Sequence, residues 1–218
     1  MIPWKPLAVA SIFIVCTEFL AISPRLAHAN WKSATGQSGT CTGASINDNK
    51  NVSIFAVAPD PGMNRGIKRT IKLMAPQLTG VLKKEHGAKT DVITRNRYYT
   101  DWCEYAMAGD WTTDGTRGMI GWTVCYQANP AGRCDQSVVR ISRHYFDAHG
   151  NAADRWIVCH EIGHSIGLGH RTVNASVQET PGCMWNGNGV RSDVKYTAHD
   201  RRHFSANWNT EPRHLTEP

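Results

Sequence analysis

The sequence predicts an α/β (α+β) fold with two main helices that lie far apart in the chain. Segments rich in β-branched residues alternate with segments whose apolar residues recur every three or four positions, and this order is typical of mixed folds. The chain has 218 residues, of which 41% are hydrophobic and 19% charged, a composition that excludes a disordered chain, collagen and a coiled coil. We expect a single domain with a core of its own.

The first 29 residues have the pattern of a secretory signal peptide. A basic start precedes the mostly apolar residues 7–22, and Ala27-His28-Ala29 fits a cleavage site with small residues. Glu18 argues against the alternative, an uncleaved membrane anchor. We therefore expect a secreted, extracellular protein that begins near Asn30 and is not stably inserted in a membrane.

Small polar residues dominate positions 30–51, so we expect a flexible lead-in to a domain that spans residues 52–218. The domain begins with a buried strand at 52–57, because this segment is β-branched and aromatic and two prolines follow it. A helix is expected next, since apolar residues recur at helical spacing at Ile67, Ile71, Met74, Leu78 and Leu82. Pro76 lies within this pattern and can kink or split the helix.

Further strands are expected in three segments: 90–95, 119–126 and 137–142. A second helix is expected from Asn151, because Asn151 and Asp154 have the spacing of a capping box and apolar residues follow them. The same spacing at Thr197 and Asp200 predicts a short closing helix.

The cysteines favour an exported chain with disulfides. Seven occur, and their number becomes even once Cys16 is removed with the signal peptide. An even set in an exported protein is typical of a disulfide framework. Cys125 and Cys134 flank a turn-rich Asn-Pro-Ala-Gly segment, so we expect them to close a hairpin. Spacing alone leaves open the pairing of the other four, Cys41, Cys103, Cys159 and Cys183.

The second predicted helix carries a pattern of metal ligands, His160-Glu161-Ile162-Gly163-His164-Ser165-Ile166-Gly167-Leu168-Gly169-His170. His160 and His164 are one turn apart and project from one face of a helix, so both can bind one ion. In a continuous helix His170 would lie about 15 Å along the axis from His160, so the chain must turn back. Gly167 suits this turn, because the residue just past a helix end often has a positive φ that glycine adopts without strain.

Three neutral imidazoles predict a catalytic zinc site, since zinc takes four ligands and the fourth position is left for water. Glu161 lies beside the ligands and can take a proton from that water. The expected activity is hydrolysis of peptide bonds by a zinc-bound water that Glu161 activates. Two alternatives remain, a secreted zinc-binding protein without catalysis and a zinc amidase that acts on a cell-wall or other non-protein substrate.

The pattern resembles the motif of the metzincin zinc endopeptidases, which it matches at His160, Glu161, His164, Gly167 and His170. The resemblance implies a twisted, mostly parallel sheet with a backing helix, an active-site helix and a small C-terminal subdomain. It also implies that Met184 lies in a turn beneath the metal. Because Arg171 follows the third histidine, the chain fits none of the family's main branches and is only loosely similar to the matrixins.

The resemblance also implies a Cys159–Cys183 disulfide between the active-site helix and the floor of the site, which leaves Cys41 to pair with Cys103. In latent matrixin-like enzymes an N-terminal cysteine instead occupies the open position of the zinc, but the residues around Cys41 lack the arginine-containing pattern of that switch. Tyr196 follows the methionine turn and, with His199, is a weaker candidate for stabilising an oxyanion.

Few other ligands or partners are expected. Asp110 and Asp114 lack the alternating ligand spacing of a calcium loop, so calcium is possible but unsupported. The formal net charge is only +6, and the basic residues of the first helix are expected to face solvent, so we expect no nucleic-acid partner. The expected state is a monomer whose partner is a protein or peptide substrate.

Overall fold

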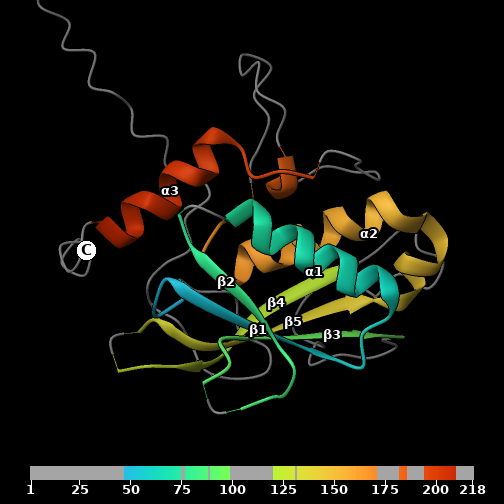
Figure 1. Cartoon of the computed structure of the whole chain (residues 1–218), viewed down its shortest axis with the longest axis horizontal. Helices are drawn as coiled ribbons and strands as arrows, with labels where there is room; N and C mark the ends of the chain where they lie inside the picture. Colours follow the sequence, from blue (N-terminus) through green and yellow to red (C-terminus); the bar gives the residue numbers. More distant parts are fainter. Residues whose placement is uncertain are drawn as a thin grey trace, which may run out of the picture.

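The structure is a computed structural model, and it describes residues 47–74, 77–87, 89–98, 120–130, 132–170, 182–185 and 194–209. Within these residues the elements follow one another as β1 (Asn51–Val57), α1 (Pro61–Met74), β2 (Thr79–Lys83), β3 (Val92–Arg97), β4 (Gly121–Ala128), β5 (Cys134–Ser142), α2 (Arg143–Ser165), the 3-10 helix η1 (Gly182–Met184) and α3 (Ala198–Asn209). Figure 1 shows this arrangement. The predicted mixed α/β fold is therefore confirmed.

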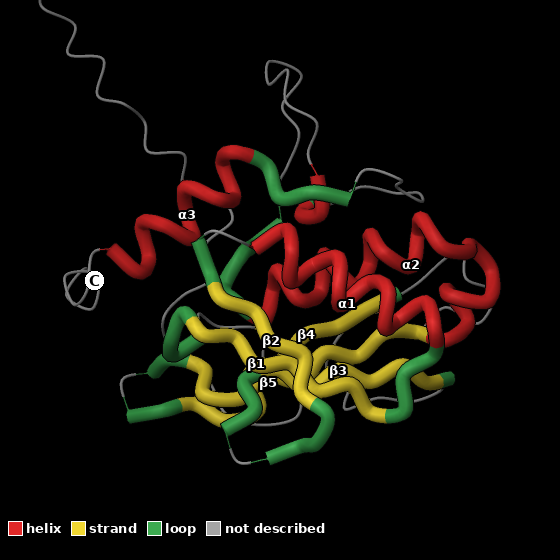
Figure 2. Tube along the Cα trace, in the orientation of Figure 1, coloured by secondary structure: helices red, strands yellow, loops and turns green. Residues whose placement is uncertain are grey.

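The five strands form one sheet in the order β2-β1-β3-β5-β4. Neighbouring strands are parallel except β4, which pairs antiparallel with β5. The helices α1 and α2 lie together on one face of this sheet (Figure 2). Strand β4 forms one edge of the sheet, and its contact with α2 brings this edge to the site described below.

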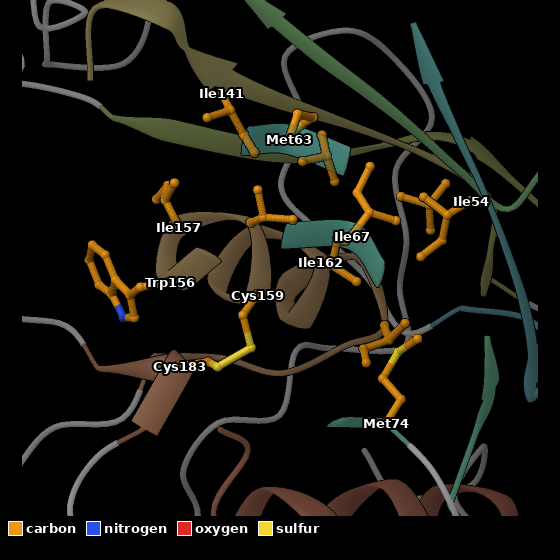
Figure 3. Close-up of a cluster of buried hydrophobic side chains, with 14 of the residues drawn as sticks. Ile54, Met63, Ile67, Met74, Ile141, Trp156, Ile157, Cys159, Ile162 and Cys183 are labelled. Carbon is orange, nitrogen blue, oxygen red and sulfur yellow. A yellow bond between two sulfur atoms is a disulfide. The ribbon is translucent and has the colours of Figure 1, made fainter. Parts of the chain in front are cut away.

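The main core lies between this face of the sheet and the two helices. It contains Val52 and Ile54 from β1, and Figure 3 shows side chains from the sheet and both helices meeting there. Alternate strand residues point to the other face. They form a smaller buried cluster of Ile93, Val124 and Val138.

The predicted strands correspond to β1, β3, β4 and β5, with ends that differ by a few residues. The prediction for the first helix was too long, because α1 ends at Met74. Leu82 continues the helical spacing in sequence but belongs to β2. A Cβ at Gly80 of this strand would lie 2.7 Å from Cε of Met74, so glycine allows α1 to pack closely on β2.

Helix α2 begins earlier than predicted, at Arg143, and is kinked at Gly150, where φ is 71°. The positive φ explains why the second, straight part starts at the predicted Asn151. The predicted capping box is not formed there. Asn151 Oδ1 accepts a hydrogen bond from the guanidinium of Arg65, and Asp154 is buried instead.

The capping box of α3 is confirmed. The backbone N–H of Thr197 donates to Asp200 Oδ2 at 2.8 Å, and the backbone N–H of Asp200 donates to Thr197 Oγ1 at 3.2 Å. This reciprocal pair fixes the start of α3 at Ala198, directly after Thr197.

Some predictions fall on segments outside the described residues. These are the signal peptide 1–29, the lead-in up to residue 46, and Cys41, Cys103, Asp110, Asp114 and Arg171. In the part of the chain that is described, no helix has both the length and the apolar character needed to cross a membrane.

Candidate metal centre

The three predicted metal ligands come together at the end of α2. His160 and His164 are one turn apart, with ring centroids 4.6 Å from each other. The Nε2 atom of His160 lies 3.1 Å from Nε2 of His164 and 3.1 Å from Nε2 of His170. The ligand atoms of all three residues lie within 4.8 Å of one another, so this group could hold a metal ion.

A glycine turn after α2 brings His170 back to the other two ligands. Gly167 has a φ of 104°. Its backbone N–H donates to the carbonyl of His164, and the N–H of Leu168 donates to the carbonyl of Gly163. This pair of bonds is the Schellman motif, which ends a helix with a residue of positive φ. The predicted role of Gly167 as the point where the chain turns is therefore consistent with the observed geometry.

Backbone carbonyls fix the tautomer of two ligands. His160 Nδ1 lies 2.7 Å from the carbonyl oxygen of Cys183, and His164 Nδ1 lies 2.7 Å from the carbonyl oxygen of Leu168. A carbonyl oxygen only accepts, so each Nδ1 carries the proton that it donates. Nε2 of each neutral ring then presents a lone pair, and these lone pairs point toward the same place. The Nε2 atoms are therefore placed to bind one metal ion together.

Burial favours the neutral state that ligation requires. His160 and His164 are 6% and 7% exposed, whereas His170 is exposed. Burial, together with the nearby ring of His170, lowers the pKa of His160 to about 3. The imidazole of His160 is consequently neutral at pH 7 and ready to donate its lone pair.

The spacing of the nitrogens fits a tetrahedral zinc ion. Zinc–nitrogen bonds are about 2.0–2.1 Å long, so two nitrogens on a tetrahedral ion lie about 3.3 Å apart. The observed separations of 3.1 Å are close to this value. Imidazole ligands suit zinc and also copper, nickel and iron, so the donor set narrows the choice of metal but does not fix it.

Glu161 lies on the side of α2 that faces strand β4. Its side chain is 4% exposed, and Thr123 Oγ1 donates to Glu161 Oε2 at 2.7 Å. The same hydroxyl lies 2.9 Å from the backbone carbonyl oxygen of Glu161. The carboxylate is thus held between the helix that carries the ligands and the edge of the sheet.

Met184 is fully buried and packs against α2. A Cβ at Gly163 would clash with the sulfur of Met184 and would lie 3.2 Å from its Cε. The turn that contains Met184 is held by Cys183, whose N–H donates to the carbonyl of Lys195 at 2.8 Å. Met184 therefore packs against the helical turn between His160 and His164.

Two of the three expected disulfides lie in the described part of the chain, and both are present. Cys125 pairs with Cys134 across the β4–β5 hairpin. Cys159 pairs with Cys183 and links α2 to η1, as Figure 3 shows. The second disulfide joins the residue before one ligand to the residue whose carbonyl orients that ligand.

The expectation for Tyr196 is not supported by its position. The side chain is fully buried, and its hydroxyl donates to the carbonyl oxygen of Cys159 at 2.9 Å. This hydroxyl is therefore engaged by the backbone of α2. His199 lies on α3, where its Nε2 is 3.0 Å from Nε2 of His203.

Sequence reasoning missed three residues of the site. Gly163 had a signal, because a glycine inside a helical segment weakens the helix and often marks a close contact. Gly121 and Thr123 had no such signal in the sequence. Both lie on strand β4, and Thr123 is 38 residues away from Glu161 in the chain. Only the packing of β4 on α2 places them there.

No protein-family model matches the sequence, and no curated protein matches it either. Assignment of a function therefore depends on the residues and on their geometry.

Proposed function

We propose that the chain is a secreted zinc-dependent endopeptidase of metzincin type. One observation carries the proposal: three histidine Nε2 atoms converge on one place, and the residue after the first histidine is a buried glutamate. Three neutral nitrogen ligands leave zinc with an open position, which is typical of catalytic sites and not of structural ones.

The residues have separate roles in the proposed reaction. His160, His164 and His170 would hold the zinc. When bound, zinc supplies a Lewis acid that polarises the scissile carbonyl and lowers the pKa of water. Glu161 takes a proton from the attacking water and then donates it to the leaving amine. Met184 fills the space beneath the ligands and keeps α2 in place.

The proposed substrate is a protein or peptide, and the proposed site of action is outside the cell. The two disulfides support export, because disulfides persist in oxidising compartments. The proposed state is a monomer that does not bind nucleic acid and is not stably inserted in a membrane after removal of the signal peptide.

The buried carboxylate disfavours the first alternative, a zinc-binding protein without catalysis. Burial of a charged group costs free energy unless it is compensated. Glu161 is 4% exposed, and its carboxylate lies beside the proposed ligands on the same helix. A protein that only stores or presents zinc gains nothing from this carboxylate.

The proposal is tested with the chain from Asn30 onward, as the parent and as Glu161→Gln. We expect about one zinc per chain in both and casein hydrolysis in the parent alone, since glutamine keeps the shape of the side chain but cannot take a proton. Hydrolysis by the Gln variant at the rate of the parent would refute the mechanism.

A second substrate separates the remaining alternatives. If zinc is bound and casein is not cleaved by either protein, a cell-wall preparation is digested in parallel. Release of soluble fragments by the parent, and not by Glu161→Gln, would favour the zinc amidase. Failure on both substrates would favour zinc binding without catalysis.

A further inference from the structure

The carboxylate of Glu161 lies against two residues of strand β4. Thr123 Oγ1 is 2.7 Å from Oε2 of Glu161, and both side chains are 4% exposed. The hydroxyl also reaches the backbone carbonyl of Glu161 at 2.9 Å, so one threonine contacts the same residue at two points. The distance of 2.7 Å is within the normal range for a hydroxyl that donates to a carboxylate.

Gly121 provides the space in which this carboxylate lies. A Cβ at position 121 would be 2.6 Å from Cγ and 2.7 Å from Cδ of Glu161, and closer still to Oε1. Real Cβ atoms do not approach other heavy atoms to within 3.0 Å. Any residue other than glycine would therefore displace Glu161 or push the strand away from α2.

We infer that Thr123 is a positioning residue for the carboxylate of Glu161, and that Gly121 leaves the space which this position requires. The inference rests on the proposed function, because it concerns the orientation of the proposed general base. A glutamate side chain has several rotatable bonds, whereas threonine in a strand has a restricted χ1 angle and places its hydroxyl oxygen reproducibly. The rigid partner thus fixes the flexible one.

The consequence of this contact is kinetic. A general base must lie within hydrogen-bonding reach of the proton that it removes, and a misplacement of about 1 Å can lower a rate by about 100-fold. Thr123 touches Glu161 and is not a ligand of the metal group, so its loss should affect the reaction rate more than the binding of substrate or zinc.

The test compares Thr123→Val, which keeps the shape and removes the hydroxyl, with Thr123→Ser, which restores it. We expect the valine variant to lower kcat for casein about 10- to 100-fold with KM changed less than about 3-fold, and the serine variant to recover most of the loss. Zinc content should remain at about one per chain in each. Thr94→Val is the matched control, because Thr94 is also buried in a strand and donates to a backbone carbonyl, that of Phe55.

Gly121→Ala tests the same contact from the other side and remains informative if the valine variant does not fold. We expect a loss of kcat with zinc retained, although the hydroxyl of Thr123 is intact. Gly87→Ala is its control, since a Cβ at Gly87 meets no atom within 4 Å. Full activity of Gly121→Ala would overturn the role given to this glycine.

A double-mutant cycle gives a readout that does not depend on activity. Urea unfolding of the zinc-free parent, Thr123→Val, Glu161→Ala and the double variant should show that the two losses of stability are not additive, because each substitution removes the same contact. Additive losses of stability would overturn the inference. Non-additive losses together with a full kcat of Thr123→Val would also overturn it, because the contact would then exist without affecting the reaction. If the parent binds zinc but cleaves nothing, the proposed function fails and the positioning role fails with it, while the cycle still reports whether the contact exists.

Discussion

Removal of the Cys159–Cys183 disulfide should weaken both the fold and the metal site, whereas removal of Cys125–Cys134 should weaken the fold alone. The first disulfide links α2 to η1. Cys183 also accepts the hydrogen bond of His160 Nδ1 at 2.7 Å, so its backbone orients a proposed ligand. In the described part of the chain, the backbone of the hairpin disulfide is not hydrogen-bonded to a ligand ring, so Cys125→Ala with Cys134→Ala is the matched control for Cys159→Ala with Cys183→Ala.

The expected loss of stability follows from the length of chain that each disulfide closes. The sequence separations are 24 for Cys159–Cys183 and 9 for Cys125–Cys134. The entropy of loop closure in the unfolded chain then gives about 3.4 kcal/mol for the first and about 2.6 kcal/mol for the second at 25 °C. Urea unfolding of the zinc-free proteins measures both values as changes in the free energy of unfolding.

The effect on the metal site is separate from this loss. Hydrogen-bond partners of metal-binding histidines typically contribute about 10- to 100-fold in metal affinity, because they hold the ring and its tautomer. Without the disulfide, Cys183 is held near α2 by its hydrogen bond to His160 and by the packing of Met184 against Gly163. Competition with a chromophoric chelator should therefore show weaker zinc binding in the variant that lacks Cys159–Cys183, and parental binding in the hairpin variant.

The two measurements can refute the reasoning independently. Equal zinc affinity in the two double variants would mean that the disulfide does not maintain the orientation of His160. A smaller loss of stability for Cys159–Cys183 than for Cys125–Cys134 would mean that loop closure does not dominate the stabilisation. The first result would contradict the assignment of this disulfide as a support of the site, and the second would contradict the estimate from loop closure.

Three further predictions concern other parts of the site and core. Gly163→Ala should lower the free energy of unfolding in urea by up to about 2 kcal/mol, because overpacking against Met184 costs about 1–3 kcal/mol and the higher helix propensity of alanine returns about 1 kcal/mol. A gain in stability would mean that Met184 moves aside freely. Burial and nearby Asp60 raise the pKa of Asp154 to about 6 from 3.8. The free energy of unfolding should therefore fall by about 3 kcal/mol as the pH rises from about 4 to above 6. Unfolding measured across this pH range should show the fall in the parent and not in Asp154→Asn. Chelation of the metal should lower the melting temperature. Free zinc at 100-fold above its Kd should raise the free energy of unfolding by about 2.7 kcal/mol at neutral pH, but not in acid, where protonated histidines cannot bind zinc. Calorimetry that finds no such stabilisation would contradict metal binding.

The elements that could be predicted are those with strong local signals. Strand β1 is rich in β-branched residues and is followed by prolines, and the capping box of α3 involves residues three apart. Strand β2 was missed because Leu82 continues the helical spacing of α1, and because the strand lies at an edge where its side chains are not fully buried. The early start of α2 was missed because Gly150 interrupts the helix without ending it.

The same distinction applies to the candidate site. The ligands His160, His164 and His170 lie within eleven consecutive residues, so helix geometry and one glycine turn are enough to predict their meeting. The contact of Thr123 with Glu161 joins residues 38 apart and depends on how β4 packs against α2. No periodicity or spacing in the sequence contains that information.

The state of the histidine protons explains why metal binding and folding should be coupled in this protein. The Nδ1 protons of His160 and His164 are committed to backbone carbonyls, so lone pairs of neutral rings face one another at 3.1 Å. A proton could relieve their repulsion only by charging an imidazole in a buried place, and burial already lowers the pKa of His160 to about 3. A divalent cation relieves the same repulsion by accepting the lone pairs. The arrangement would therefore stabilise a metal-bound chain more than the metal-free chain, and we expect this difference to contribute to the stability of the proposed zinc complex.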